Sequence, residues 1–262
     1  MTAVSREAAD KREHTMSTTP EQRVAIVTGG SRGIGRAVAE RLAADGQTVA
    51  VVYAGNKTEA DNTVAAIREA GGRAAAYQAD VADEQAVAAV FDSVIAEFGG
   101  VDVVVNSAGM MALAPLASFD LDVLDRLHRT NIRGTFVVNQ QAARHVRPGG
   151  AIINMSTSVT KLGLPTYAAY AASKGAVDAI SLVLAKELRG RDITVNAVAP
   201  GPTATALFLD GKDEDTIDTM AKMNPLERLG TPEDIAEVIS LVAGRGRWIN
   251  GQTVYVNGGM VA

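Results

Sequence analysis

The chain has 262 residues, of which 47% are hydrophobic and 21% are charged, and its formal net charge is −5. This length fits one large α/β domain, and the acidic balance argues against a broad nucleic-acid-binding surface. There is no cysteine, and the histidines His14, His128 and His145 are far apart, so we expect neither disulfides nor a metal centre. No apolar run reaches the roughly 18 residues of a membrane span, and no secretory signal is present. We therefore expect a soluble cytoplasmic protein without membrane or nucleic-acid partners.

Residues 1–21 are polar and lack periodicity, which predicts a flexible N-terminal tail. From residue 22 to 262, short apolar runs alternate with segments rich in Ala, Leu, Glu and Arg. The runs predict strands at 24–27, 48–53, 74–77, 101–105, 151–154, 193–198 and 252–256. The segments between them predict helices at 33–45, 58–70, 83–98, 120–146, 164–189 and 232–243. This alternation predicts the α/β class, as a single doubly wound Rossmann domain whose seven-stranded parallel sheet has helices on both faces.

The segment 203–224 is polar, acidic and weakly periodic, and it follows the sixth predicted strand. A segment of this length after a strand end suggests a mobile lid over a site. An ordinary surface insertion would have the same composition, so the residues alone leave both interpretations open.

A glycine-rich loop at 28–35 follows the first strand directly and opens the first helix. Glycines there permit a tight turn and a close approach of the backbone to a pyrophosphate, which the free N–H groups of the helix N-terminus bind. The predicted binding residues are Gly29, Ser31, Arg32, Gly33, Ile34 and Gly35.

Tyr170 and Lys174 lie one helical turn apart, so both side chains share a face of the predicted helix. A lysine in that position favours the phenolate and lowers the pKa of a tyrosine from its usual value near 10. Such a phenol can exchange a proton near neutral pH. A solvated surface pair would have the same spacing, and only a neighbouring cofactor site favours the catalytic interpretation.

The glycine loop has the spacing GxxxGxG, and Asn106-Ser107-Ala108-Gly109 follows the fourth strand. Together with the Tyr170–Lys174 pair, these motifs resemble the short-chain dehydrogenase/reductase family in its compact single-domain branch, over residues 22–262. The resemblance implies catalytic roles for Asn131, Ser158, Tyr170 and Lys174. It also implies a homotetramer in which the helices 120–146 and 164–189 pair across an interface.

The end of the second strand predicts NADP(H) rather than NAD(H) as the cofactor. NAD-specific sites place a carboxylate there, whereas this chain has Tyr53, Asn56 and Lys57 and no acid before Glu59. Arg32, Asn56 and Lys57 are the candidates for binding a 2′-phosphate, unless Arg32 and Lys57 are ordinary surface residues. By resemblance, further cofactor contacts are expected from Asp80, Val81, Asn106, Ala108, Gly109, Tyr170, Lys174, Pro200, Gly201 and Thr203.

The resemblance implies that Ser158 donates a hydrogen bond to the reacting oxygen and that Tyr170 supplies the proton. Lys174 lowers the pKa of Tyr170, and Asn131 holds a water near Lys174. The family's commonest spacing of thirteen residues before the tyrosine would select Thr157. We favour Ser158, because Ser158-Val159 fits the usual pattern of a serine followed by a small apolar residue. Tyr167 is a weaker candidate than Tyr170, since no lysine follows it by four residues.

The substrate pocket is expected to be walled by apolar side chains, for which the candidates are Leu207, Phe208 and Met220 with Met110, Met111 and Leu164. The function predicted is an NADPH-dependent reductase that converts a ketone or aldehyde to an alcohol. One alternative is a 3-oxoacyl-[acyl-carrier protein] reductase, for which Arg126, Arg129 and Arg133 would form the carrier patch. The other is a regulator that senses NADPH without catalysis.

Overall fold

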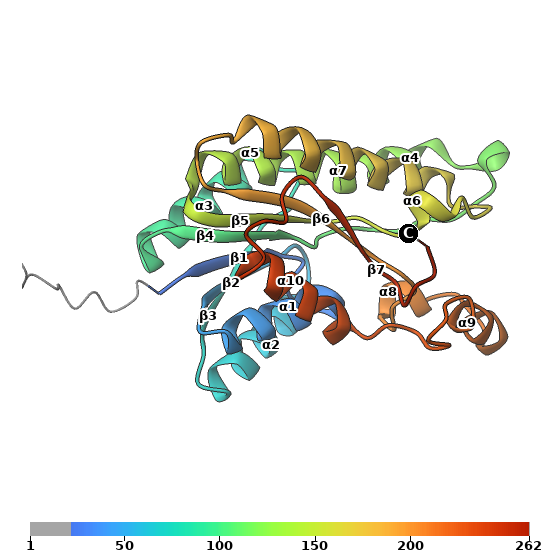
Figure 1. The fold of residues 1–262 in the computed structure, drawn as a ribbon, viewed down its shortest axis with the longest axis horizontal. Coiled ribbons are helices and arrows are strands. Elements are labelled where there is room, and N and C mark those ends of the chain that lie inside the picture. The colour runs from blue at the N-terminus through green and yellow to red at the C-terminus, as the bar shows by residue number, and fades with distance from the viewer. Residues whose placement is uncertain (1–21, 262) are drawn as a thin grey trace, which may run out of the picture.

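A computed structural model of the chain describes residues 22–261, so the predicted tail at 1–21 lies outside the described residues. Its centre is one parallel sheet of seven strands in the order β3-β2-β1-β4-β5-β6-β7 (Figure 1). The order reverses at β1, so the chain builds one half of the sheet outward, returns to the middle, and builds the other half. The strands are β1 (Val24–Thr28), β2 (Thr48–Tyr53), β3 (Arg73–Gln78), β4 (Val101–Asn106), β5 (Val146–Met155), β6 (Thr194–Pro200) and β7 (Thr253–Val256).

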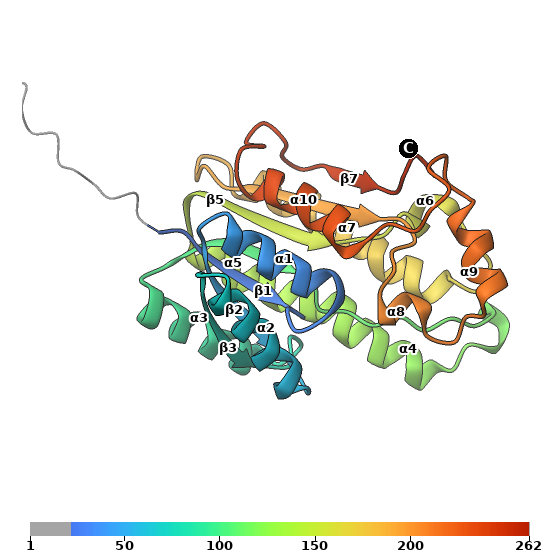
Figure 2. The same ribbon diagram turned by 90° about the horizontal axis from the view of Figure 1, so that it is seen from below.

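Helices cover both faces of the sheet, as predicted (Figures 1 and 2). One face carries α1 (Gly33–Ala44), α2 (Lys57–Glu69) and α10 (Pro232–Ala243), and the other carries α3 (Glu84–Phe98), α5 (Thr135–His145) and α7 (Ala168–Glu187).

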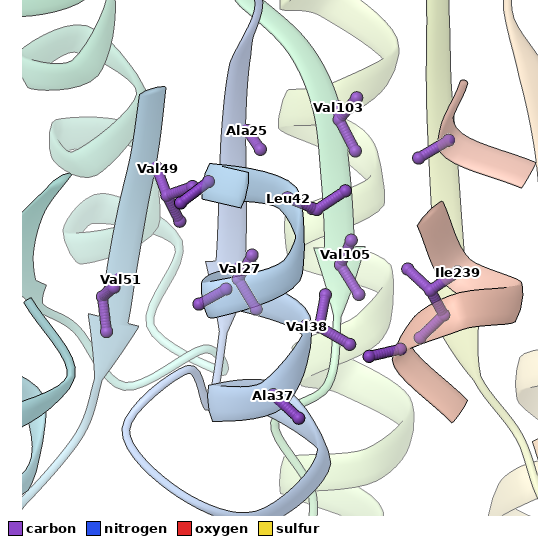
Figure 3. Packing of buried hydrophobic residues seen from close by; sticks show 14 of the residues in the cluster. Ala25, Val27, Ala37, Val38, Leu42, Val49, Val51, Val103, Val105 and Ile239 are labelled. Atoms are coloured by element: carbon purple, nitrogen blue, oxygen red, sulfur yellow. The ribbon is translucent and has the colours of Figure 1, made fainter. Parts of the chain in front are cut away.

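Successive side chains of one strand supply the two cores, because they point to opposite faces. On β1, Ala25 and Val27 pack under α1, where Figure 3 shows them with Leu42, whereas Val24 and Ile26 pack into the core on the other face. Strands buried on both faces explain why the runs in the sequence are continuously apolar.

Two helix starts follow the expected capping chemistry. Thr231 and Asp234 form a reciprocal capping box at α10, with Pro232 at its first turn. At α3, the Asp83 side chain accepts hydrogen bonds from the backbone N–H groups of Gln85 and Ala86. These caps fix where each helix begins after its strand.

The segment predicted as one helix at 120–146 is built in three parts. They are α4 (Leu121–His128), a π-helical turn η2 (Arg129–Gly134) and α5. A π-turn inserts one extra residue per turn and is frequent at functional sites, which a period of 3.6 residues cannot reveal.

The segment predicted as a helix at 164–189 begins later than expected. α7 starts at Ala168, because Thr166 has a left-handed backbone with φ 70° and follows Pro165. A short helix α6 (Val159–Leu162) precedes it, and the 3-10 turn η1 (Leu116–Ser118) was also not predicted. Within 203–224 the chain forms α8 (Ala206–Leu209) and α9 (Glu214–Ala221).

By length and composition alone, α7 is long and apolar enough to cross a membrane. In the structure it packs against β5 and β6, and its buried residues include the polar Ser173 and Lys174. These contacts make α7 a layer of the α/β fold.

Candidate active site

A cavity of about 940 Å³ lies where the carboxyl ends of the strands meet, beside the point at which the strand order reverses. Ligands of doubly wound sheets bind at such a position. The structure brings most of the predicted site residues together there. Those that line the cavity are Gly29, Ser31, Arg32, Gly33, Ile34, Gly35, Tyr53, Asn56, Asp80, Val81, Ala108, Gly109, Ser158, Tyr170, Lys174, Pro200, Gly201 and Thr203.

The glycine loop leaves backbone exposed to the cavity because side chains do not fit around it. Gly29 has φ +63°, and a Cβ on it would lie 2.9 Å from the backbone of Ala108. A Cβ on Gly35 would lie 2.2 Å from the Gly29 carbonyl oxygen. At Arg32, which precedes α1, no side chain caps the helix, so its first N–H groups remain available for an anion. The loop therefore fits the pyrophosphate of a dinucleotide.

The cavity wall near the end of β2 carries side chains of both charges. Arg32 is exposed on the cavity wall and, among residues 22–261, has no carboxylate partner. Asn56 also lines the cavity, and its side chain accepts a hydrogen bond from the Glu59 N–H at the start of α2. That turn places Glu59 on the same wall, which corrects the expectation that a 2′-phosphate meets no acid there.

Two predicted cofactor residues do not line the cavity. Lys57 binds Asp61, one turn along α2, with 2.6 Å between Nζ and Oδ2, and both side chains are exposed, so its contact with a 2′-phosphate stays a prediction. Asn106 is 4% exposed and donates from Nδ2 to the Asn154 side chain at 2.8 Å. It therefore holds β4 to β5 from within the core, and the prediction that it contacts the cofactor is not supported by its position.

Asp80 lies at the end of the third strand, where an adenine contact was expected. Its carboxylate accepts a hydrogen bond from the Ala82 N–H and binds Arg129 at 2.6 Å. Burial raises the pKa of Asp80, but these two partners outweigh it and hold the pKa below the ordinary value.

Tyr170 is half-buried in the cavity wall, near the start of α7. Burial raises the pKa of its phenol to about 12, while a hydrogen bond with the Thr157 side chain acts in the opposite direction. Burial of the phenol is the larger effect, so this pKa lies above its usual value near 10. At neutral pH the phenol is protonated, which is the form that donates a proton.

Of the two hydroxyl residues, Thr157 is the one whose side chain acts on the pKa of Tyr170. Ser158 is 1% exposed, and its Oγ donates to the Ala199 carbonyl at 3.2 Å and accepts from Asn257 Nδ2 at 3.1 Å. These contacts favour Thr157 over Ser158 as the hydroxyl that acts on the substrate, in agreement with the family spacing of thirteen residues.

Lys174 is 6% exposed, and its Nζ donates to the Met155 carbonyl at 2.7 Å and lies 5.9 Å from the centre of the Tyr170 ring. Burial lowers the pKa of Lys174 to about 8, although the negative charge of Asp178 acts to raise it. Asp178 follows Lys174 by one helical turn and accepts a hydrogen bond from Thr253 Oγ1 at 3.3 Å. A carboxylate fixed in this way helps to keep the buried ammonium protonated.

Asn131 lies in the π-helical turn η2 and is fully buried, outside the cavity wall. Its amide exchanges hydrogen bonds with the backbone of Met110, each at 2.9 Å, and donates to Ser173 Oγ at 3.0 Å. Its side chain therefore fastens the loop after β4 to α7, and the expected water near Lys174 stays a prediction. This contact fixes the position of Met110 in the cavity wall.

Comparison with known proteins is consistent with this arrangement. A family model described as enoyl-(acyl carrier protein) reductase matches residues 29–261. A short-chain type dehydrogenase/reductase of Picea abies is 42% identical over 250 residues, covering 91% of this chain and 92% of the relative. The chain belongs to the short-chain dehydrogenase/reductase family.

Two further members of the family concern the cofactor. An NADPH-dependent aldehyde reductase-like protein of Arabidopsis thaliana is 38% identical, covering 91% of this chain and 94% of the relative. The crystal structure of a short-chain dehydrogenase from Burkholderia cenocepacia in complex with NADP has a TM-score of 0.86 and 39% identity, covering 92% and 99%.

In this short-chain dehydrogenase/reductase, the segment after β6 covers the cavity. Leu207 and Phe208, from α8, and Met220, from α9, line it with Met110, Met111 and Leu164, as predicted. Asn224 fixes the C-terminal end of this segment, because its Nδ2 donates to the carbonyl groups of Ala221 and Arg228, both at 2.9 Å. The segment is therefore part of the site rather than an unrelated insertion.

Several residues of the site were not predicted from the sequence, among them Asp178, Asn257 and Met260. Asp178 could have been predicted, because it follows Lys174 by four residues, the same helical spacing that pairs Tyr170 with Lys174. Met260 and Asn257 carried no such signal, since only the folded chain brings the segment after β7 to Ser158 and the cavity.

Proposed function

We propose that this protein is an NADPH-dependent reductase that converts a ketone or aldehyde to an alcohol. The observation that carries the proposal is the position of Tyr170, one helical turn from Lys174 on α7, in the same cavity as the glycine loop. Reduced nicotinamide, when bound, supplies a hydride to a carbonyl carbon.

Residues of the protein supply the proton for the carbonyl oxygen and stabilise the negative charge that develops on it. Negative charge develops on the carbonyl oxygen during reduction, and the Thr157 hydroxyl stabilises it by donating a hydrogen bond. Tyr170 then gives up its proton to that oxygen. The ammonium of Lys174, which Asp178 favours, stabilises the resulting phenolate. Gly29, Gly33 and the first turn of α1 would hold the pyrophosphate, as argued above.

Activity of the purified protein over a panel of carbonyl compounds, followed as loss of NADPH absorbance, tests the proposal. Tyr170→Phe is expected to lower kcat by about 10²- to 10⁴-fold, because the proton donor is removed. Tyr255→Phe, outside the cavity wall, is the matched control. Activity retained by Tyr170→Phe would refute the mechanism.

A comparison of Thr157→Ala with Ser158→Ala separates the two hydroxyls. Loss of an oxyanion donor costs about 10²- to 10³-fold in kcat, and we expect that loss from Thr157→Ala. Ser158→Ala should mainly lower stability, since its hydroxyl bonds within the protein. Thermal unfolding of each variant, measured beside kcat, distinguishes the two effects.

The preference for NADPH rests on Arg32, the unpaired cation at the end of the cavity near β2. Arg32→Ala is expected to raise the KM for NADPH and leave the KM for NADH nearly unchanged. Glu59→Gln, which removes the opposing charge on the same wall, should lower the KM for NADPH. A wild-type protein that prefers NADH would overturn the cofactor assignment.

Two alternatives have less support. A carrier-protein substrate would need a free basic patch, yet Arg129 binds Asp80 at 2.6 Å and Arg133 approaches Glu84 at 3.6 Å. An NADPH sensor would bind the cofactor without turnover, so binding measured by fluorescence beside an inactive panel would favour it. The panel should include an enone, which tests reduction of a C=C bond instead of a carbonyl.

A homotetramer is proposed as the working assembly. Apolar side chains on the outer surface of α5 and α7 support it: Phe136 is 57% exposed, Leu182 45% and Val183 53%. Covering such groups stabilises an interface. Light scattering on the wild type and on Phe136→Glu measures the assembly, and an unchanged mass in the variant would count against this surface.

A further inference from the structure

The methionines of this protein gather at one place. The chain has eight, of which Met1 and Met16 precede the described residues. The other six all line the cavity of about 940 Å³: Met110, Met111, Met155, Met220, Met223 and Met260. Among the described residues, the rest of the large hydrophobic core contains none.

These six side chains come from segments that surround the reacting end of the cavity. Met110 and Met111 follow β4, Met155 ends β5, Met220 and Met223 belong to the covering segment, and Met260 follows β7. Met155 is 6% exposed, whereas Met223 is 42% exposed. Apolar side chains left open around a cavity indicate a ligand that covers them.

Charge is distributed unevenly along the cavity. Among the described lining residues, the charged ones are Arg32, Glu59 and Asp80 at the ends of the first strands, and Lys174 beside Tyr170. The rest of the lining adds apolar residues such as Leu162, Leu164 and Phe208 and uncharged polar residues such as Thr157 and Tyr167. An ionised substrate would lose its hydration there without gaining a charged partner, which is unfavourable.

Methionine differs from leucine in the range of ligand shapes against which it can pack. Its unbranched side chain has three rotatable bonds and fills irregular spaces, and its sulfur makes favourable contacts with aromatic rings of about 0.3–1.5 kcal/mol each in proteins generally. A wall of six methionines therefore adapts to ring systems of several shapes. A wall of branched residues would select one shape.

We propose that the natural substrate is an uncharged ketone on a fused aromatic ring system, and that the methionine wall lets the enzyme accept several such rings. This inference rests on the proposed reductase function. The hydride would go to the carbonyl carbon and the Tyr170 proton to its oxygen, so the ring carrying the ketone lies against the methionines.

The test reads binding and turnover separately. Full-length protein with ¹³C-methyl-labelled methionine is titrated, in the presence of NADP, with 1-tetralone, with an open-chain ketone of equal carbon count, and with a tetralone carboxylate. We expect 1-tetralone to bind most tightly and to shift the methyl resonances of the cavity, while those of Met1 and Met16 stay in place as internal controls. Equal or tighter binding of the open-chain ketone or the carboxylate would overturn the inference.

Met220→Leu and Met223→Leu keep the side-chain volume and remove the sulfur. Each is expected to lower kcat/KM for 1-tetralone by about 2- to 10-fold, the equivalent of one sulfur–ring contact, with a smaller effect on the open-chain ketone. Equal losses for both ketones would remove the role assigned to the sulfurs.

The two proposals fail in different ways. If ketones are reduced but the cavity methyl resonances do not move, the substrate inference is wrong and the reductase stands. If these resonances shift with 1-tetralone but no carbonyl is reduced, the binding site stands and the reductase function is wrong.

Discussion

Burial of the Lys174 ammonium lowers the free energy of unfolding, and this effect can be measured without any substrate. This lysine is buried, and burial lowers its pKa from 10.5 to about 8, so its charged form is held in the fold at an energetic disadvantage. The difference between those pKa values corresponds to about 3 kcal/mol. Below pH 8 both the folded and the unfolded chain carry this proton, and the full cost is present.

Between pH 8 and 10.5 the unfolded chain binds a proton at this lysine that the folded chain has released. Stability from this group therefore rises with pH across that window, because the unfolded state holds more protons. Lys174→Met removes the titration while keeping an unbranched side chain. We expect the free energy of unfolding of the variant, minus that of the wild type, to fall by about 3 kcal/mol from pH 7 to pH 10.5.

Urea denaturation of the cofactor-free proteins, followed by circular dichroism at fixed protein concentration, measures this difference. Taking the difference between two proteins at each pH cancels the titration of all other groups. Lys186→Met, an exposed lysine on the same helix, is the control and should give a flat difference. A flat difference for Lys174→Met would show that the ammonium is not held at a cost, and the argument from burial would fail.

Three further changes test the surroundings of the site. Asp178→Asn removes a negative charge that favours the ammonium of Lys174, so activity should decline at a lower alkaline pH than in the wild type, and Asp178→Glu should restore the pH–rate profile. Gly35→Ala is expected to prevent folding, because its Cβ would lie 2.2 Å from a carbonyl oxygen. Gly46→Ala has open space, so it should fold, with a loss of about 1–2 kcal/mol in a thermal melt from the backbone strain at φ +87°. Thr231→Ala removes the capping box of α10 and should lower the free energy of unfolding by about 1 kcal/mol in urea, with kcat unchanged. A fall in kcat would contradict a purely structural role.

The strands and most helix positions could be predicted from the sequence because their signals are local. Continuous apolar runs mark strands covered on both faces, and Thr231 and Asp83 mark helix starts by their own side chains. The π-turn around Asn131 was hidden, since a single extra residue does not disturb the average periodicity over a long segment.

The site could be placed but not resolved in detail. Thr157 and Ser158 both follow β5 closely, and the folded chain shows that Ser158 is bonded to Ala199 and Asn257. Such long-range partners decide which polar side chains remain available, and no local pattern reports them. Lys57 is a different case, because its partner Asp61 lies four residues along the same helix and that spacing was already readable in the sequence.

The segment after β7 has a practical consequence for anyone who handles the protein. Asn257 is tied to Ser158 and to the Val261 carbonyl, and Met260 forms part of the cavity wall, so a peptide joined after these residues would emerge beside the substrate. The start of β1 lies at the opposite end of the strands from the cavity (Figure 1). Affinity tags and fluorescent fusions joined after the segment that follows β7 are therefore expected to disturb ligand entry.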